Sequence, residues 1–164
     1  MSAKHVLSVL VLGFLAFNVA PEAAGSATAT ASFGVSVTVQ ATCLVSASSM
    51  NFGAYTGTAL NATSAISVNC TNSTPYNVGL SAGLAPGATV NNRRMVGPGS
   101  ALLSYALSSS SQGIVNWGKT VGADTVAGTG NGTPQALSVH GLISAGQFIT
   151  TGAYSDTITV TVSY

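Results

Sequence analysis

Charged side chains are almost missing from this sequence. Of its 164 residues, Lys and Arg contribute 4 and Asp and Glu contribute 3, so that charged residues make up 4%, whereas soluble domains average about 25%. A protein that binds nucleic acid needs several Lys or Arg side chains to neutralise phosphates. Beyond the first turn of the chain the cations are Arg93, Arg94 and Lys119. These are too few for a basic patch, which excludes nucleic-acid binding.

Long apolar runs are also missing, except near the N-terminus. Lys4 and His5 precede an apolar run over residues 6–17, and small residues follow over 20–27. This is the order of segments in a secretory signal peptide, and the run is too short to span a bilayer as a helix. We therefore expect residues 1–25 to be a signal peptide, with cleavage between 24 and 27. The mature chain is expected to be exported, with no segment inserted in a membrane.

Glutamate disappears from the chain once the signal peptide is removed. Lys4 and Glu22 are lost with it, which leaves three cations against Asp124 and Asp156, a net charge of 3 − 2 = +1. The polarity of the surface must then come from hydroxyls, amides and backbone. Hydrophobic residues make up 46% of the sequence, which is enough for one core in a domain of this size.

Only two cysteines are present, Cys43 and Cys70. In an exported chain a disulfide is the default state of such a pair. The alternatives are a metal site, which would need more ligands than these two and the lone mature histidine, His140, and a redox pair, which is normally a C-x-x-C motif. A disulfide here would restrict the unfolded chain by about 3–4 kcal/mol.

Helical periodicity is nearly absent, and period-two alternation takes its place. It is clearest over residues 33–39, where Phe33, Val35, Val37 and Val39 share one face of an extended segment. Further strands are expected at residues 42–45, 50–55, 66–70, 76–80, 102–107, 136–140 and 157–164. Turn residues separate these segments, and residues 108–134 are expected to form a long loop or a weak edge hairpin. The pattern predicts an all-β antiparallel sandwich in a single domain.

One catalytic motif matches literally. Gly113, four further residues, and then Gly118, Lys119 and Thr120 spell the G-x-x-x-x-G-K-T phosphate loop. That loop works between a strand and a helix, where backbone amides and the helix N-terminus meet the phosphates. Residues 108–112 do not resemble a buried strand, and four glycines between 121 and 132 oppose a helix. Nucleotide binding is therefore not expected.

Other catalytic or binding arrangements have simpler explanations. A triad of a serine with His140 and Asp156 arises by chance in any serine-rich chain, and no G-x-S-x-G motif is present. Asp124 and Asp156 could form a carboxylate pair, but each lies in a turn-like sequence where Asp bonds to the backbone. A carbohydrate-binding surface could be built on Trp117, although tryptophan more often fills a core.

The segment before the first cysteine is unusual. Residues 26–32 are small, and the alternating residues 33–39 run into the Cys43 strand without a turn residue. An extended arm of this kind can leave its own domain and lie on another sheet edge.

Several short motifs together resemble the spore coat protein U family, which includes the subunits of archaic chaperone-usher pili. They cover essentially the whole mature chain and are Cys43 after an alternating arm, Asn51-Phe52-Gly53, Cys70 followed by Thr71 to Tyr76, Arg93-Arg94-Met95, Trp117-Gly118, Ala145-Gly146, Gly152 to Thr157 and Val160 to Tyr164. Two positions depart from the family pattern. His140 stands where tyrosine is common, and Leu142 replaces a usual basic residue.

The resemblance implies an incomplete immunoglobulin-like sandwich (residues 41–164) with an N-terminal donor-strand arm (residues 26–40). The arm of a neighbouring subunit would fill the groove left by a missing strand, with Phe33, Val35, Val37 and Val39 as its plugs. Cys43 and Cys70 would link the first two strands, and residues 157–164 would border the groove. A periplasmic chaperone would occupy the groove before assembly, and an outer-membrane usher would exchange it for the arm.

These expectations describe a non-enzymatic structural subunit of a surface pilus without cofactors, supporting adhesion or biofilm formation. Its partners would be identical or related subunits, the chaperone and the usher. It would pass through the periplasm to the cell surface. Two alternatives stay open: a secreted coat protein with the same fold, and a small secreted module that binds carbohydrate or a surface.

Overall fold

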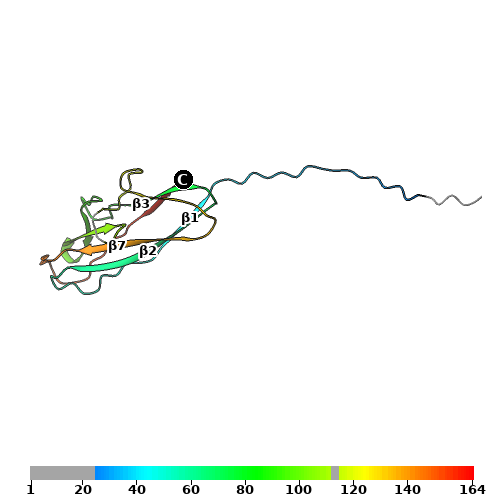
Figure 1. Cartoon of the computed structure of the whole chain (residues 1–164). Helices are drawn as coiled ribbons and strands as arrows, with labels where there is room; N and C mark the ends of the chain where they lie inside the picture. Colours follow the sequence, from blue (N-terminus) through cyan, green and yellow to red (C-terminus); the bar gives the residue numbers. More distant parts are fainter. Residues whose placement is uncertain (1–24, 112–114) are drawn as a thin grey trace, which may run out of the picture. The chain divides into compact units, whose positions relative to one another are not determined.

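The computed structural model describes residues 25–111 and 115–164, so that the expected signal peptide lies outside the described residues except for Gly25. By its contacts the chain divides into two units, Met1–Val37 and Thr38–Tyr164. The described part of the first unit has no regular secondary structure, and all of its residues are exposed. The second unit is built from β-strands (Figure 1).

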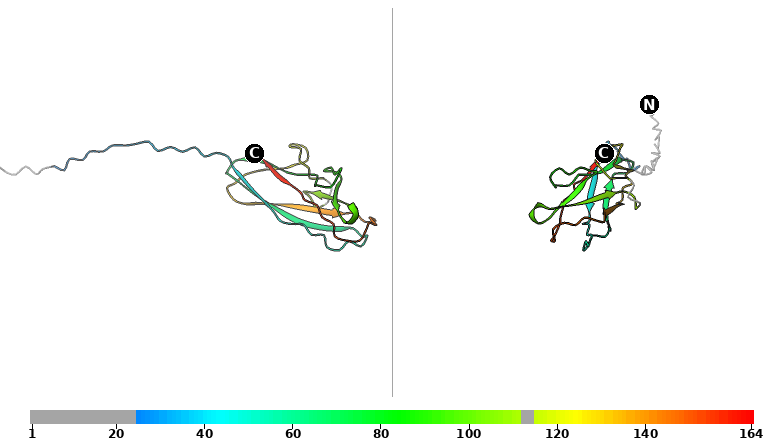
Figure 2. Two further views of the ribbon diagram at one scale, coloured as in Figure 1. Left: turned by 180° about the vertical axis from the view of Figure 1, so that it is seen from behind. Right: turned by 90° about the vertical axis from the view of Figure 1, so that its left-hand side faces the viewer.

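The eight strands of the second unit form two antiparallel sheets. They are β1 (Cys43–Ala47), β2 (Leu60–Cys70), β3 (Pro75–Leu80), β4 (Arg93–Val96), β5 (Leu102–Ser108), β6 (Val126–Thr129), β7 (Gln135–Ile143) and β8 (Val160–Ser163), with one 3-10 turn, η1 (Pro98–Ser100). The larger sheet has the order β1-β2-β7-β5-β4, and the smaller has the order β6-β3-β8. The two sheets pack through a shared core (Figures 1 and 2).

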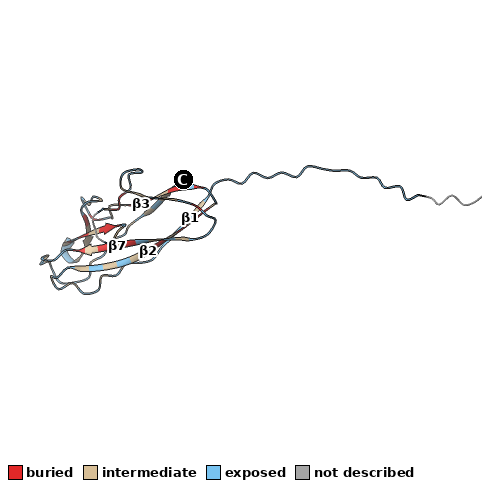
Figure 3. Ribbon diagram, in the orientation of Figure 1, coloured by how far each residue is buried: buried red, intermediate tan, exposed pale blue. Residues whose placement is uncertain are grey.

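The core follows from the alternation along the central strands. In β2, Ile66, Val68 and Cys70 are buried, while the residues between them are only half-buried. The alternation puts every second side chain of a strand on the inner face. The same rule buries Val139 and Ile143 of β7. Buried side chains of β3 from the smaller sheet meet them, and Figure 3 shows the buried positions in red along these strands.

The disulfide links the first two strands. Cys43 and Cys70 are register partners on β1 and β2, and their sulfur atoms are bonded. The pairing continues one residue beyond the strands, since the Thr71 amide donates to the Thr42 carbonyl at 3.0 Å. The end of the sandwich where β1 begins is therefore held both covalently and by the ladder.

The expected strand at residues 50–55 is wrong, because the structure has a loop there. Asn51 Oδ1 accepts the Gly53 amide at 2.8 Å, and Gly53 has φ = 78°, a conformation that glycine adopts without steric cost. In addition, no strand of the described chain pairs with this segment. An extended segment without a neighbour has no ladder to satisfy its backbone groups.

Three further elements differ from the sequence-based expectation. The strand β4 was not predicted, because its inward-facing residue is a charged Arg93 and not an apolar side chain. Residues 108–134, expected to form a long loop or a weak edge hairpin, contain β6, an edge strand of the smaller sheet that alternates weakly between half-buried and exposed residues. The last strand is shorter than residues 157–164, since β8 pairs with β3 only over Val160–Ser163.

Arg93 is the most unusual core residue. It is 0% exposed, and its guanidinium donates to the carbonyl oxygens of Ser81 (2.9 Å), Val90 (3.0 Å), Leu80 (3.2 Å) and Trp117 (2.6 Å). Burial lowers the pKa of this guanidinium, and the nearby Tyr105, Asp124 and Asp156 act in the opposite direction. The planar fork of arginine can reach several acceptors at once. Arg93 therefore joins the end of β3, the loop after it and the Trp117 segment.

We expect Arg93→Lys to lower the free energy of unfolding by about 3 kcal/mol, because an ammonium cannot reach all four carbonyls and unpaired buried carbonyls are costly. Guanidinium unfolding of the purified chain, followed by the fluorescence of the buried Trp117, measures the loss. Arg94→Lys is the matched control, since Arg94 is only half-buried and bonds to a single carbonyl, that of Gly87. Equal effects of the two substitutions would contradict the role given to Arg93.

Candidate functional site

A groove of about 1070 Å³ opens along one side of the sandwich. Two segments form its walls, which we call the β1-side rim (residues 47–57) and the β8-side rim (residues 147–160). The first follows β1 of the larger sheet, and the second leads into β8 of the smaller sheet. The groove therefore lies where the two sheets would be joined by one more strand.

The floor of the groove is apolar. It consists of core side chains from both sheets, namely Ile66, Leu80, Leu103, Leu107, Val139 and Ile143. Met95 of β4 lines the groove beside them. An open groove over a hydrophobic core marks a site where another apolar segment binds.

The β8-side rim alternates in the same way as a strand. Tyr154, Asp156, Ile158 and Val160 are half-buried, whereas the residues between them are exposed. The rim begins on the larger sheet, where Ser155 and Val96 exchange two backbone hydrogen bonds of 2.9 and 3.1 Å, and then passes to the smaller sheet, where the Ser81 amide donates to the Thr159 carbonyl at 3.0 Å. Among the described strands, β8 pairs only with β3. Its other edge is free to accept a strand.

Asp156 holds the rim at the point where it changes sheets. Its Oδ2 accepts the Tyr105 hydroxyl at 2.6 Å, and its Oδ1 accepts the backbone amides of Leu84 and Thr157, both at 2.8 Å. Burial, together with the hydrogen bond to Asp156, raises the pKa of Tyr105 well above its ordinary value. A Cβ at Gly83 would collide with this carboxylate, so that the loop after β3 can approach it only with glycine there. Asp156 thus joins strand β5, the loop after β3 and the rim.

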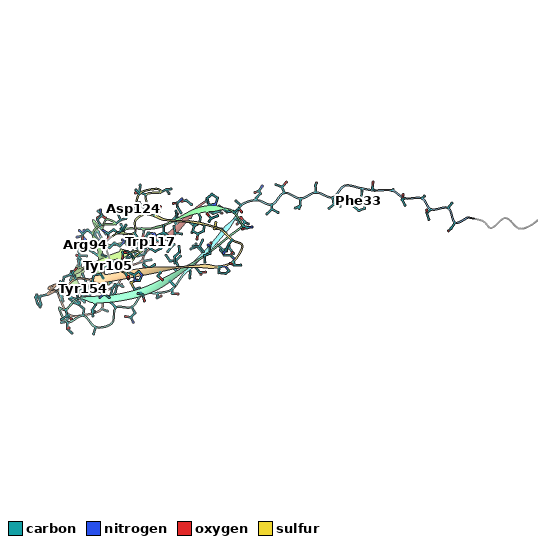
Figure 4. All side chains as sticks on the ribbon, viewed as in Figure 1. Phe33, Arg94, Tyr105, Trp117, Asp124 and Tyr154 are labelled. Atoms are coloured by element: carbon teal, nitrogen blue, oxygen red, sulfur yellow. A yellow bond between two sulfur atoms is a disulfide. The ribbon has the colours of Figure 1, made fainter. Side chains whose placement is uncertain are left out.

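The β1-side rim is fixed by aromatic residues. Phe52 and Tyr55 are half-buried and pack against the core, and the Phe52 ring meets the Tyr105 ring edge-on at 6.4 Å between centroids. The Tyr55 hydroxyl donates to the Ser144 carbonyl at 2.7 Å and accepts the Gln147 amide at 3.0 Å. Tyr55 therefore links the two rims at the loop end of the groove, the end formed by residues 53–57 and 147–153. Figure 4 labels Tyr105 and Tyr154, which lie in the same part of the sandwich.

The four predicted donor residues are exposed. Phe33, Val35, Val37 and Val39 have exposed fractions of 88%, 85%, 87% and 80%, and Figure 4 labels Phe33 on the arm. They lie on a segment without strand pairing. These four apolar side chains therefore bury little surface within the described chain and contribute little to its folding.

The phosphate-loop residues do not form a nucleotide site in the described chain. Gly113 lies outside the described residues. Lys119 and Thr120 lie in a loop that continues through a turn into β6, so that no helix follows the motif. Asp124 bonds within this loop, where its Oδ1 accepts the Thr120 amide at 2.6 Å. The carboxylate of Asp124 therefore serves a turn, whereas that of Asp156 joins separate segments of the sandwich.

The other candidates are also structural. His140 occupies an outward position of β7, opposite Thr63, between the buried Val139 and Gly141, whereas Asp156 lines the groove. Trp117 is 1% exposed, and its indole nitrogen donates to the Val78 carbonyl at 2.7 Å. It fills the core and offers no platform for a sugar.

In residues 25–111 and 115–164, no group of three or more His, Cys, Asp or Glu side chains could hold a metal ion. The same part of the chain contains no helix that is long and apolar enough to cross a membrane.

The sequence pointed to the groove only in part. Residues 157–164 were expected to border it, and Ile158 and Val160 do line it. Tyr105 gave no signal, because its position in an alternating strand is that of an ordinary core residue. Asp156 was assigned to a turn, and its place at an inward-facing position of the rim became visible only from the alternation of Tyr154, Ile158 and Val160.

The structure thus has two antiparallel sheets, a disulfide between β1 and β2 of the larger sheet, and an open apolar groove, which together describe a β-sandwich with a groove along one side. Residues 29–161 match the Spore Coat Protein U domain. The chain belongs to this family, whose members are structural and not enzymatic.

Two similar proteins extend the comparison. Protein U of Myxococcus xanthus is 31% identical over 158 residues, which cover 86% of this chain and 88% of the relative. A chain in the crystal structure of the CsuC-CsuE chaperone-tip adhesion subunit pre-assembly complex, from the archaic chaperone-usher Csu pili of Acinetobacter baumannii, matches with 27% identity and a TM-score of 0.60. That match covers 77% of the present chain, which spans 41% of the Csu chain. The predicted fold class, an all-β immunoglobulin-like sandwich, is confirmed.

We expect Tyr105→Phe to loosen the β8-side rim, because the variant loses the hydrogen bond that ties Asp156 to strand β5. The free energy of unfolding should fall by about 1.5–3 kcal/mol, the usual contribution of a hydrogen bond to a charged group, and the amides of Leu84 and Thr157 should exchange faster with deuterium. Tyr76→Phe is the control, since the Tyr76 hydroxyl makes a longer bond of 3.3 Å to Gln135. Unchanged exchange at both amides would show that the bond does not hold the rim.

Proposed function

We propose that this chain is an exported structural subunit that polymerises by donor-strand complementation. The arm of one copy, residues 26–40, fills the groove of the next. The observation that carries the proposal is the fit between two exposed features of one chain: an apolar groove beside a free strand edge, and an extended segment whose apolar side chains repeat at period two.

The contacts available to the arm are large enough for assembly. Burying four side chains of the Phe and Val type contributes about 6–12 kcal/mol in total, at about 1.5–3 kcal/mol each. Backbone hydrogen bonds to the free edge of β8 add about 0.5–1.5 kcal/mol apiece. Ordering the arm and bringing two chains together offset a good part of this sum. The remainder supports a stable joint between subunits.

Strand addition also explains why the two rims lack regular pairing. Residues 50–55 and 154–158 form no ladder within the described chain beyond the bridge between Ser155 and Val96. A strand inserted between them would supply hydrogen-bond partners to both, which is the general mode of strand addition at an exposed sheet edge. The fold is then complete only in the polymer.

The exposed groove explains why the subunit would need a chaperone before it is assembled. An open apolar groove aggregates in water, so that a periplasmic chaperone holds each subunit before an outer-membrane usher exchanges the chaperone for the next arm. The Csu structure is a complex of a chaperone with a subunit, which supports the first partner. Residues 1–25 act as the signal peptide, and the product is a surface pilus that supports adhesion or biofilm formation.

A second candidate has its own support. The match to Protein U covers 88% of that protein, whereas the Csu match covers 41% of its chain. A secreted coat built from single-domain subunits of the same fold is consistent with this difference. Electron microscopy of cells that express the protein separates the two, because a pilus gives filaments and a coat gives a surface layer. The third alternative, a carbohydrate-binding module, was based on Trp117 as a surface residue, and it is not supported because Trp117 is buried.

We expect Val37→Asp to abolish polymer formation, because the joint would have to bury an unpaired carboxylate. Thr38→Asp is the matched control, as it places the same charge on the opposite face of the arm. Ladders of multimers on a gel run without boiling report assembly.

Deletion of residues 26–39 should likewise give only monomers, and a peptide with the sequence of the arm should bind to them. If the deleted chain still forms multimers, or if Val37→Asp assembles like Thr38→Asp, then the arm is not the donor.

A further inference from the structure

The alternation of the arm extends well beyond its four large plugs. From Ser26 to Thr42 every odd-numbered position is apolar and every even-numbered position is polar or glycine. The side chains on the apolar face change in size, however. They are alanine at positions 27, 29 and 31, then Phe33 and three valines, and alanine again at 41. The apolar face of the arm therefore has a sharp step in size between Ala31 and Phe33.

The groove also changes along its length, because its lining stops before β1 and β8 do. Its lining ends at Ala47 on one rim and at Val160 on the other. Beyond these residues β1 and β8 approach each other, with Cα atoms within 8 Å, and Figure 2 shows β8 in red beside β1 in cyan. Val45 is 43% exposed at this junction, and Val162 is half-buried. Residues 43–46 of β1 and 161–163 of β8, which we call the closed end, thus offer apolar side chains but lie outside the lining of the groove.

The direction of the arm follows from where it joins the sandwich. The chain enters β1 at Cys43, at the closed end, and β1 runs from there to the groove at Ala47. In a linear row of copies, the closed end of one subunit therefore faces the loop end of the next. The arm enters through that loop end with Val39 outermost and Phe33 deepest. It then runs antiparallel to β8, which passes from the loop end to the closed end.

We propose that the size step fixes the register of the joint, and that the donor strand continues past the groove along the free edge of β8. This rests on the proposed function. Inward-facing positions pair as Val39 with Tyr154, Val37 with Asp156, Val35 with Ile158, Phe33 with Val160, and Ala31 with Val162. Phe33 fills the last deep position, and Ala31 and Ala29 cover the shallow junction of β1 and β8.

Side-chain volume is the reason for this register. A slip of two residues toward the closed end would push Phe33 onto the junction of β1 and β8, where the core leaves no room for an aromatic ring. A slip in the other direction would leave alanine in a deep position and create a cavity. Alanine suits the junction because it buries Val45 and Val162 without displacing β1. The exposed backbone edge of β8 supplies the hydrogen bonds for this part of the strand.

A pair of matched variants tests the size step in the full mature chain. Ala31→Phe places a ring against the junction and should lower the yield of multimers about tenfold, whereas Thr30→Phe carries the same ring on the opposite face and should assemble like the parent chain. Equal yields from the two variants, whether both normal or both impaired, would overturn the proposal.

Cross-linking tests the register directly. A chain with Ala31→Cys and Val162→Cys should form disulfides between neighbouring copies in assembled material, because facing residues on paired strands lie close enough to be bridged. Ala31→Cys with Ile158→Cys is the control and should not. The reverse result would place the strand in another register.

A chain that begins at Phe33 separates this inference from the proposed function. Its multimers should form but dissociate at a lower temperature than those of the full arm. If they are as resistant as the parent multimers, then residues 26–32 take no part in the joint and only the further inference fails. If neither the full mature chain nor the chain that begins at Phe33 forms multimers, the proposed function itself is wrong.

Discussion

The sandwich has a hydrophobic floor that its own strands do not cover, and the rest of the molecule can be understood from this constraint. Both sheets contribute apolar side chains to the groove, but β8 ends the smaller sheet with a free edge and the larger sheet ends at β1. The rims can stay in place without an intervening strand only if other contacts fix them. Tyr55 does so at the loop end, Asp156 does so where the rim changes sheets, and the disulfide holds the closed end.

The few charges of the mature chain are used inside the molecule. Arg93 binds four backbone carbonyls, and Asp156 accepts two backbone amides and a tyrosine hydroxyl. Asp124 closes its own loop in the same way. These side chains replace missing backbone partners at places where strands end or loops cross between the sheets. The structure therefore places one charge, Arg93, in the core and three, Arg94, Asp124 and Asp156, at half-buried positions, and leaves Lys119 exposed.

Periodicity located β3 and β5 almost entirely, because their alternation of apolar residues reflects a real division between core and solvent. It located β2 and β7 only in part, at residues 66–70 and 136–140, and it also located most of the edge strand β1. Prediction failed where a residue has an unusual role. β4 was missed because an inward-facing arginine, Arg93, breaks the apolar pattern. Residues 50–55 were wrongly predicted as a strand because their sequence alternates, although no described strand lies beside them to pair with. The groove could not be predicted from the sequence, because a missing strand leaves no pattern in the residues around it. The arm that we propose as its occupant, by contrast, could be recognised in the sequence by its alternating apolar residues.

The free edge of β8 and the two rims, whose one charged residue is Asp156, also determine how the proposed joint would respond to its surroundings. A contact made of apolar side chains and backbone hydrogen bonds contains no ion pair for dissolved salt to screen. Its strength should then be the same in fresh water and in brine, whereas cooling should weaken it because the hydrophobic contribution declines at low temperature. A filament or coat held together in this way would be indifferent to salinity but sensitive to cold.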